Sequence, residues 1–256
     1  MKIPESPVPL LLVGPSGAGK TASVIASYGY VEVMLASTLA EEDIAGLPYR
    51  KGNYDYRTVP AMFRRLSDAD AAGKTTALFL DELDKARRAV ADTLLTLIAS
   101  RRVGDGALPA ATRIIAAANP PETGGGDGIS EAMISRFAVV DFVPDTRSWS
   151  DWAETQFATP TARKIIAAVR CGEIPLLDIA GEGLARRITS PRTLAYALMV
   201  VEGSGDPRLI QGLVTAATAS QILMLMDGST DDIAVVAANL RRAAAIRKKI
   251  EPLRLP

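Results

Sequence analysis

The segment from Gly14 to Thr21 constrains this chain more than any other. It consists of Gly14, Pro15, Ser16, Gly17, Ala18, Gly19, Lys20 and Thr21, and it fits the pattern G-x-x-x-x-G-K-[ST]. The apolar run 8–13 before it predicts a buried strand, and residues 21–27 predict the start of a helix. Strand, glycine-rich loop and helix in this order are the context in which the pattern binds phosphate.

The expected chemistry of this loop follows from its backbone. Glycines at 14, 17 and 19 allow tight turns that present N–H groups to anionic oxygens. The helix that begins near Lys20 points its positive dipole end at the same place. We therefore expect Lys20 to reach the β- and γ-phosphates of a nucleotide, and the Thr21 hydroxyl to ligate Mg²⁺.

Composition excludes several other kinds of chemistry. The chain has no histidine and a single cysteine, Cys171, so a zinc site is not expected and a histidine-based triad is excluded. Cys171 forms no internal disulfide, and we expect it to be a small buried hydrophobic residue rather than a nucleophile. Lys+Arg and Asp+Glu each number 29, and this balance does not indicate a general binder of nucleic acid or membrane surfaces.

Strand and helix signals alternate over residues 1–145. Strands are predicted at 8–13, 30–35, 76–80, 114–118 and 138–143. Helices are predicted at 60–72, 89–100 and 130–135, with a shorter one that starts at Glu41. Residues 49–56 are predicted to form a polar, aromatic loop, and residues 101–112 a hairpin or loop. The alternation predicts an α/β fold in which a parallel sheet is covered by helices on both faces.

The pattern beyond residue 145 is helical. Helices are predicted at about 149–158, 161–171, 191–202, 206–226 and 231–250, with no strand among them. We therefore expect an α/β nucleotide-binding domain over residues 1–145 and a small all-α lid domain over residues 146–256. Basic residues gather at 241–249; a solvated helix end is expected there, and a nucleic-acid patch is the alternative.

No targeting or membrane segment is predicted. Prolines at 4, 7 and 9 interrupt the apolar stretch that follows Lys2, and no run reaches the roughly 18 apolar residues of a membrane helix. We expect a soluble, cytoplasmic protein. The first strand begins close to Met1, so no separate N-terminal domain is expected.

Three polar residues follow two of the predicted strands. Asp81 is predicted to hold Mg²⁺ through water, and Glu82 to polarise the water that attacks the γ-phosphate. Two solvated acids at a strand end are the alternative. Asn119 ends the next buried strand, at the sheet edge where ligands bind. Its amide is predicted to orient the attacking water, and an Asx turn before Pro120 is the alternative.

Two arginines occupy positions that suggest a phosphate partner. Arg136 follows the short predicted helix, from which it would stabilise γ-phosphate charge in a neighbouring subunit. Arg192 follows Ser190, a candidate N-cap, and Pro191 at position N1. A cation in the first turn opposes the helix dipole, which suggests an anionic partner. Placement on the solvated surface is the alternative for both arginines.

The order of these segments resembles that of an AAA+ ATPase, a P-loop NTPase with a three-layer αβα sandwich. Gly14–Thr21 resembles Walker A, Leu78–Glu82 Walker B, Asn119 sensor 1, Ser135–Phe137 the arginine finger and Ser190–Arg192 sensor 2. The resemblance covers nearly the whole chain. It implies Mg²⁺-dependent hydrolysis of ATP, with catalytic roles for Glu82, Asn119, Arg136 and Arg192.

Segments 42–46, 81–86 and 117–120 are similar to the MoxR and dynein-related branch of that family. This branch implies a homo-oligomeric ring, typically a hexamer, that remodels or activates a protein partner. In MoxR-type proteins the partner often carries a von Willebrand factor A domain. Neither a membrane nor nucleic acid is expected as a partner.

Other classes of function remain as alternatives. A P-loop kinase or GTPase is one, but the chain lacks the Asn-Lys-x-Asp guanine signature, and a kinase would not need Arg136 and Arg192. An ATP-gated scaffold with little turnover is another, and Glu82 and Asn119 argue against it. The segment 49–56 is predicted either to face a pore or partner or to be anchored to its own domain by its tyrosines.

Overall fold

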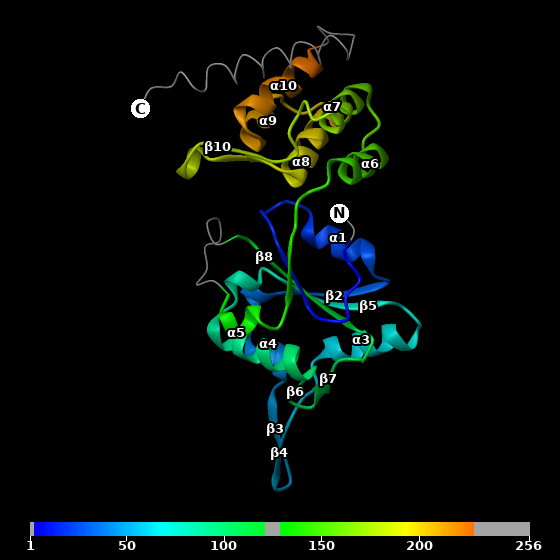
Figure 1. Ribbon diagram of the computed structural model, residues 1–256, viewed down its shortest axis with the longest axis vertical. Coiled ribbons are helices and arrows are strands. Elements are labelled where there is room, and N and C mark those ends of the chain that lie inside the picture. The colour runs from blue at the N-terminus through cyan, green and yellow to red at the C-terminus, as the bar shows by residue number, and fades with distance from the viewer. Residues whose placement is uncertain (1–2, 121–128, 228–256) are drawn as a thin grey trace. The chain divides into compact units, whose positions relative to one another are not determined.

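The computed structural model describes residues 3–120 and 129–227. The chain divides into two compact units, Met1–Val143 and Pro144–Pro256 (Figure 1). The division lies two residues before the boundary expected from the sequence. It falls directly before Pro144, within the segment 142–145 that follows the last strand of the first unit.

A five-stranded parallel sheet forms the centre of the first unit. Its strands are β1 (Leu10–Val13), β2 (Tyr30–Leu35), β5 (Thr76–Asp81), β8 (Arg113–Ala118) and β9 (Ala138–Asp141), in the order β2-β5-β8-β1-β9. All four neighbouring pairs are parallel. The interior strand β5 is buried on both faces, as its continuous apolar run predicts.

Helices cover both faces of this sheet, so the predicted three-layer αβα sandwich is confirmed. The helices are α1 (Lys20–Ser27), α2 (Glu41–Ala45), α3 (Ala61–Ala71), α4 (Arg88–Ser100) and α5 (Glu131–Ile134). One apolar core contains side chains of the helices α2, α3, α4 and α5 together with strand residues such as Leu78 and Leu80. The other joins Val24 of α1 with Phe79 and the opposite face of the strands. Successive strand residues alternate between these two cores, and Figure 1 shows α1 and α3–α5 on opposite sides of the sheet.

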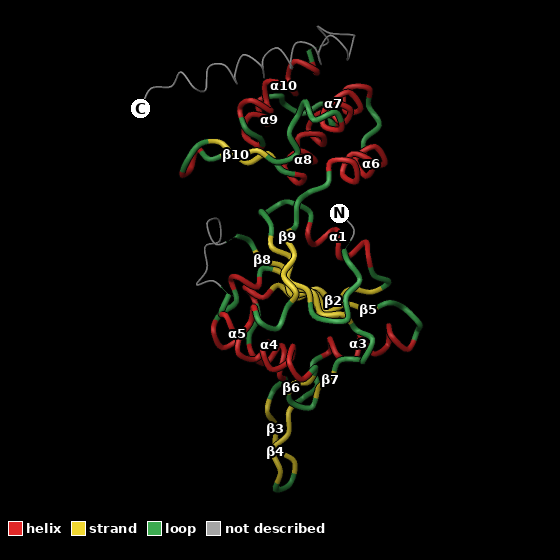
Figure 2. The backbone as a smooth tube through the Cα atoms, in the orientation of Figure 1, coloured by secondary structure: helices red, strands yellow, loops and turns green. Residues whose placement is uncertain are grey.

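Two hairpins extend from the helical layer that contains α3 and α4 (Figure 2). One pairs β3 (Pro48–Lys51) with β4 (Tyr54–Arg57), and the other pairs β6 (Arg102–Val103) with β7 (Gly106–Ala107). The prediction of an irregular loop at 49–56 is therefore wrong. Alternating tyrosines favour strands, and Gly52, at φ 63°, makes the turn between them.

The tyrosines of the β3–β4 hairpin do not anchor it to the rest of the unit. Every residue of both strands is exposed. The rings of Tyr49 and Tyr56, which are cross-strand partners, stack with their centroids 5.6 Å apart. Tyr54 is 70% exposed. Of the two interpretations of this segment, anchoring to its own domain is wrong.

The second unit is mainly helical. It contains α6 (Thr146–Gln156), α7 (Pro160–Arg170), α8 (Pro191–Glu202), α9 (Arg208–Leu213) and α10 (Ala216–Met226) around one apolar core. The single helix predicted at 206–226 is divided at Val214, whose backbone is extended. The helix predicted at 231–250 and the basic residues at 241–249 lie outside the described residues.

Two expectations for this unit are wrong. It is not all-α, because β10 (Asp178–Ala180) and β11 (Arg187–Thr189) pair as an antiparallel hairpin. Strands of three residues are too short to produce a recognisable alternation. Cys171 is exposed rather than buried, because it is the C-cap of α7, where the helix ends at the surface. Within residues 3–120 and 129–227, no helix is long and apolar enough to cross a membrane.

Candidate nucleotide-binding site

The loop between β1 and α1 lies at the carboxyl end of the central strands. Gly14 N donates to Ala118 O, at the end of β8, at 3.2 Å. A Cβ at Gly14 would lie 2.4 Å from Phe142 O, so only glycine fits there. Gly17 and Gly19 have φ of 77° and 96°, a region that favours glycine. Of the other residues in the loop, Ser16 is exposed, Pro15 half-buried and Ala18 buried.

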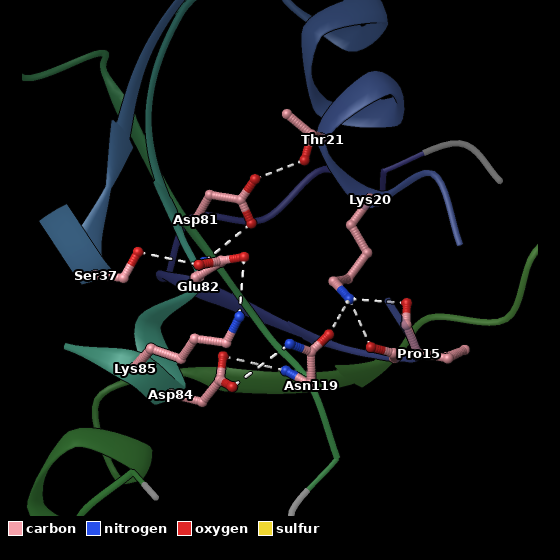
Figure 3. A network of polar contacts seen from close by, with 10 residues as sticks. Pro15, Lys20, Thr21, Ser37, Asp81, Glu82, Asp84, Lys85 and Asn119 are labelled. Carbon is pink, nitrogen blue, oxygen red and sulfur yellow. Dashed lines mark hydrogen bonds and ion pairs between the residues drawn. The ribbon is translucent and has the colours of Figure 1, made fainter. Parts of the chain in front are cut away.

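Lys20 is the first residue of α1, and its side chain is buried against the loop. Its Nζ donates to Gly14 O, to Pro15 O at 3.1 Å and to Asn119 Oδ1 at 3.2 Å (Figure 3). The ammonium group is thus held at the N-terminal end of α1 among oxygen acceptors. Phosphate oxygens brought to the same helix end would compete with these acceptors for the ammonium group.

Thr21 and Asp81 bring the loop and the end of β5 together. Thr21 Oγ1 donates to Asp81 Oδ2 at 2.6 Å. A hydroxyl and a carboxylate are the hard oxygen ligands that Mg²⁺ accepts, usually with water and substrate phosphates completing its shell. The pair therefore fits the predicted magnesium site. Among the described residues, no group of three or more acidic or cysteine side chains is arranged to hold a metal ion by itself.

Glu82 follows β5 in a left-handed backbone conformation, with φ of 54°. Its carboxylate is held on both oxygens: Ser37 Oγ donates to Oε2 at 3.0 Å, and Lys85 Nζ lies 3.1 Å from Oε1. Strained φ values in non-glycine residues are concentrated at functional sites. The alternative of two freely solvated acids at the strand end does not describe this geometry.

Asn119 lies between a cation and an acid. Its Oδ1 accepts from Lys20, while its backbone N donates to Asp84 Oδ1 at 3.2 Å and its Nδ2 to Asp84 Oδ2 at 3.5 Å. Asp84 is only 6% exposed. The contact with Lys20 joins the end of β8 to the phosphate-binding loop, and the role of Asn119 in orienting the attacking water stays a prediction.

Three residues of this network were not singled out as site residues from the sequence. Asp84 and Lys85 follow Glu82 in the short 3₁₀ helix Leu83–Lys85, and their place in the segment 81–86 was a usable signal. Ser37 follows β2 and reaches Glu82 across 45 residues of sequence. No local pattern marks it, because only the pairing of β2 with β5 brings it to the site.

The two predicted arginines are both exposed. Arg136 lies in the turn after α5, and its guanidinium donates to Ala132 O. Arg192 belongs to the second unit, in the first turn of α8. Ser190 caps that helix by accepting from Thr193 N at 3.3 Å, as predicted. The roles of both arginines in nucleotide chemistry stay predictions.

The parallel sheet, the glycine loop and the acids at the end of β5 define a P-loop nucleotide-binding fold. The family model for the AAA domain of the dynein-related subfamily matches residues 9–137, just over half of the chain. The chain therefore belongs to the dynein-related subfamily of AAA domains, and nucleotide binding is expected of it. The comparison with curated proteins found no match.

Several solved structures are similar in fold. NtrX from Brucella abortus is 17% identical, with a TM-score of 0.44, over 77% of this chain and 47% of NtrX. A RuvB variant from Thermotoga maritima is 17% identical, with a TM-score of 0.46, over 88% of this chain and 63% of RuvB. NtrX in complex with ADP is 17% identical, with a TM-score of 0.45, over 98% and 65%. The chain spans less than two thirds of each of these proteins.

Proposed function

We propose that this AAA protein hydrolyses ATP in a Mg²⁺-dependent reaction. The single observation that carries the proposal is the 2.6 Å contact between Thr21 Oγ1 and Asp81 Oδ2. It brings the hydroxyl that follows the phosphate-binding loop to the carboxylate at the end of β5, although β8 lies between β1 and β5 in the sheet. Mg²⁺, when bound, would neutralise charge on the phosphate oxygens and orient them.

Residues of the chain would bind the phosphates and activate the attacking water. The backbone of Gly14–Lys20 and the Lys20 ammonium would hold the phosphates. Glu82 would accept a proton from the attacking water, and Asn119 would orient that water. Ser37 and Lys85 would hold the Glu82 carboxylate in place, and each of its oxygens keeps a second lone pair with which to accept from the water.

Phosphate release tests this proposal directly. Wild-type protein should release phosphate with Mg²⁺ and stop when EDTA is added. Glu82→Gln should keep nucleotide affinity and lose about 10²–10⁴-fold in turnover, which is the contribution of a positioned general base. Lys20→Ala should lose nucleotide binding. Unchanged turnover in Glu82→Gln would remove Glu82 from the mechanism.

A nucleotide-gated scaffold with little turnover is the second candidate. The observation in its favour is the same pair of contacts that engages both oxygens of Glu82. The phosphate-release assay separates the two candidates. If the wild-type protein binds ATP tightly but turns it over no faster than Glu82→Gln does, the scaffold is favoured.

We also propose that the chain works in a homo-oligomeric ring, with a hexamer as the expected form, and acts on a protein partner. The exposure of Arg136 supports the ring, because an arginine finger must be free to reach a neighbouring subunit. The exposed aromatic β3–β4 hairpin is our candidate contact for the partner. A partner with a von Willebrand factor A domain is the first to test.

The partner can be sought with the slow Glu82→Gln variant as bait in the presence of ATP. A second bait should add Tyr54→Ser, which alters the hairpin. A control bait should instead add Tyr196→Ser, which alters an exposed tyrosine on α8. A protein retained by the control and lost with Tyr54→Ser supports contact through the hairpin. Equal retention by both baits would contradict it.

A further inference from the structure

Asp84 is a buried acid that has no part in the mechanism proposed above. It lies in the 3₁₀ helix Leu83–Lys85 and is 6% exposed. Both of its carboxylate oxygens accept from one residue: Oδ1 from Asn119 N at 3.2 Å and Oδ2 from Asn119 Nδ2 at 3.5 Å (Figure 3). A buried carboxylate needs such donors, and here a candidate site residue supplies them.

The charges on either side of Asn119 determine which way its amide faces. Its oxygen faces the Lys20 ammonium at 3.2 Å, and its nitrogen faces the Asp84 carboxylate. Turning the amide over would place NH₂ against an ammonium group and C=O against a carboxylate. Neither of those pairs can form a hydrogen bond, because an ammonium group only donates and a carboxylate only accepts.

We propose that Asp84 is a positioning residue that fixes the amide of Asn119 with Oδ1 toward the reacting water. This inference rests on the proposed ATPase function. When Lys20 turns to phosphate oxygens, Asn119 Oδ1 remains as a hydrogen-bond acceptor and Nδ2 stays with Asp84. Asn119 then acts on the attacking water as a hydrogen-bond acceptor through Oδ1.

This orientation gives the water a defined geometry for attack. One water hydrogen is held by Asn119 Oδ1 and the other by the Glu82 carboxylate, so a lone pair on the water oxygen faces phosphorus. As the oxygen–phosphorus bond forms, the bond to the β-phosphate oxygen breaks and Glu82 takes the proton. Both side chains act as acceptors, so a donor amide at Asn119 is not required.

Exchanging the two side chains tests the proposal. Asp84→Asn removes the charge that orients the amide and should lower kcat about 10- to 100-fold, the effect of losing a positioned group, with little change in nucleotide affinity. Asp84→Asn combined with Asn119→Asp restores a donor–acceptor pair and keeps an oxygen toward the water. The kcat of the exchanged protein should be at least about tenfold higher than that of Asp84→Asn. Asn119→Asp alone, with two facing carboxylates, should be both unstable and slow.

A donor role for Asn119 predicts the opposite result. The carboxylate at position 119 in the exchanged protein cannot donate, so activity would stay at or below that of Asp84→Asn. That outcome overturns the proposal. An exchanged protein that fails to fold while Asp84→Asn folds also overturns it, because the two side chains are then not an interchangeable pair.

Thermal unfolding of the four proteins separates this inference from the proposed function. The exchanged protein should melt closer to wild type than the sum of the two single changes predicts. This measurement needs no turnover. Wild-type protein that binds ATP without hydrolysing it would refute the ATPase, whereas additive changes in melting temperature would refute the pairing of Asp84 with Asn119.

Discussion

Gly14→Ala should disable the nucleotide site through a single methyl group. The new Cβ would lie 2.4 Å from Phe142 O, closer than ordinary contact by about 1 Å. Neither Gly14 nor Phe142 can move away without losing a backbone hydrogen bond. Gly14 N donates to Ala118 O, and Phe142 N donates to Val13 O. Relief of the contact therefore displaces the phosphate-binding backbone by much of that 1 Å, and a displacement of this size costs about 10²-fold in turnover.

Two other glycines provide matched comparisons for this change. Gly19→Ala meets no atom within 4 Å, but its φ of 96° imposes backbone strain, worth about 1–2 kcal/mol. Gly212→Ala, in α9, also meets no atom within 4 Å and has no such φ. The Gly212 variant should keep wild-type nucleotide binding and stability.

Titration with a fluorescent ATP analogue, phosphate release and thermal unfolding of the three variants would measure these effects. Gly14→Ala should lose binding and turnover by about 10²-fold, Gly19→Ala by less, and Gly212→Ala not at all. If Gly14→Ala binds nucleotide as tightly as wild type and melts at the same temperature, the close approach of Phe142 does not constrain the loop.

Three further predictions concern the ion pair of the buried Glu32 with the exposed Arg65, and the arginines Arg136 and Arg192. Hydrogen bonds from Arg65 lower the pKa of Glu32 below its usual 4.5, so this carboxylate stabilises the fold above pH 4.5 and loses that contribution as pH falls through its folded pKa. The stability difference between wild type and Glu32→Gln in urea unfolding should therefore shrink in acid; a constant difference would contradict this. Arg136→Ala should bind ATP but hydrolyse it slowly, since a finger in trans is worth about 10³–10⁵-fold. Mixing it with Lys20→Ala subunits should restore part of the activity, and a mixture that stays inactive would argue against a finger in trans. Arg192→Ala should lower the equilibrium affinity for ATP more than the affinity for ADP. Equal losses of the two affinities would count against contact with the terminal phosphate.

The sequence predicted the parts of the fold that rest on local patterns. The strand at 30–35 lies where its alternation placed it, and the glycine loop is followed by a helix as expected. Features that depend on distant pairing were not predicted. The contact of Ser37 with Glu82 needs the register of β2 against β5, and the contact of Asp84 with Asn119 joins a turn to the end of another strand. Sequence spacing carries no information about either contact.

The β3–β4 and β10–β11 hairpins were not predicted from the sequence, for different reasons. Tyr49 and Tyr56 stand among charged residues, so the segment has strand-forming side chains but no apolar face, and polarity suggested a loop. The β10–β11 hairpin has strands of three residues, below the length at which alternation can be recognised. Gly181, at φ 79°, was a usable turn signal for it.

Phe142 contacts the phosphate-binding loop and lies two residues before the start of the second unit. Its carbonyl faces Gly14, its N–H is bonded to Val13 O at 2.7 Å, and its side chain is 2% exposed. Only Val143 separates it from Pro144, where the second unit begins. Proline fixes one of the two backbone dihedrals at that point. A backbone rotation at Phe142 therefore has a single residue, Val143, in which to be absorbed before the proline.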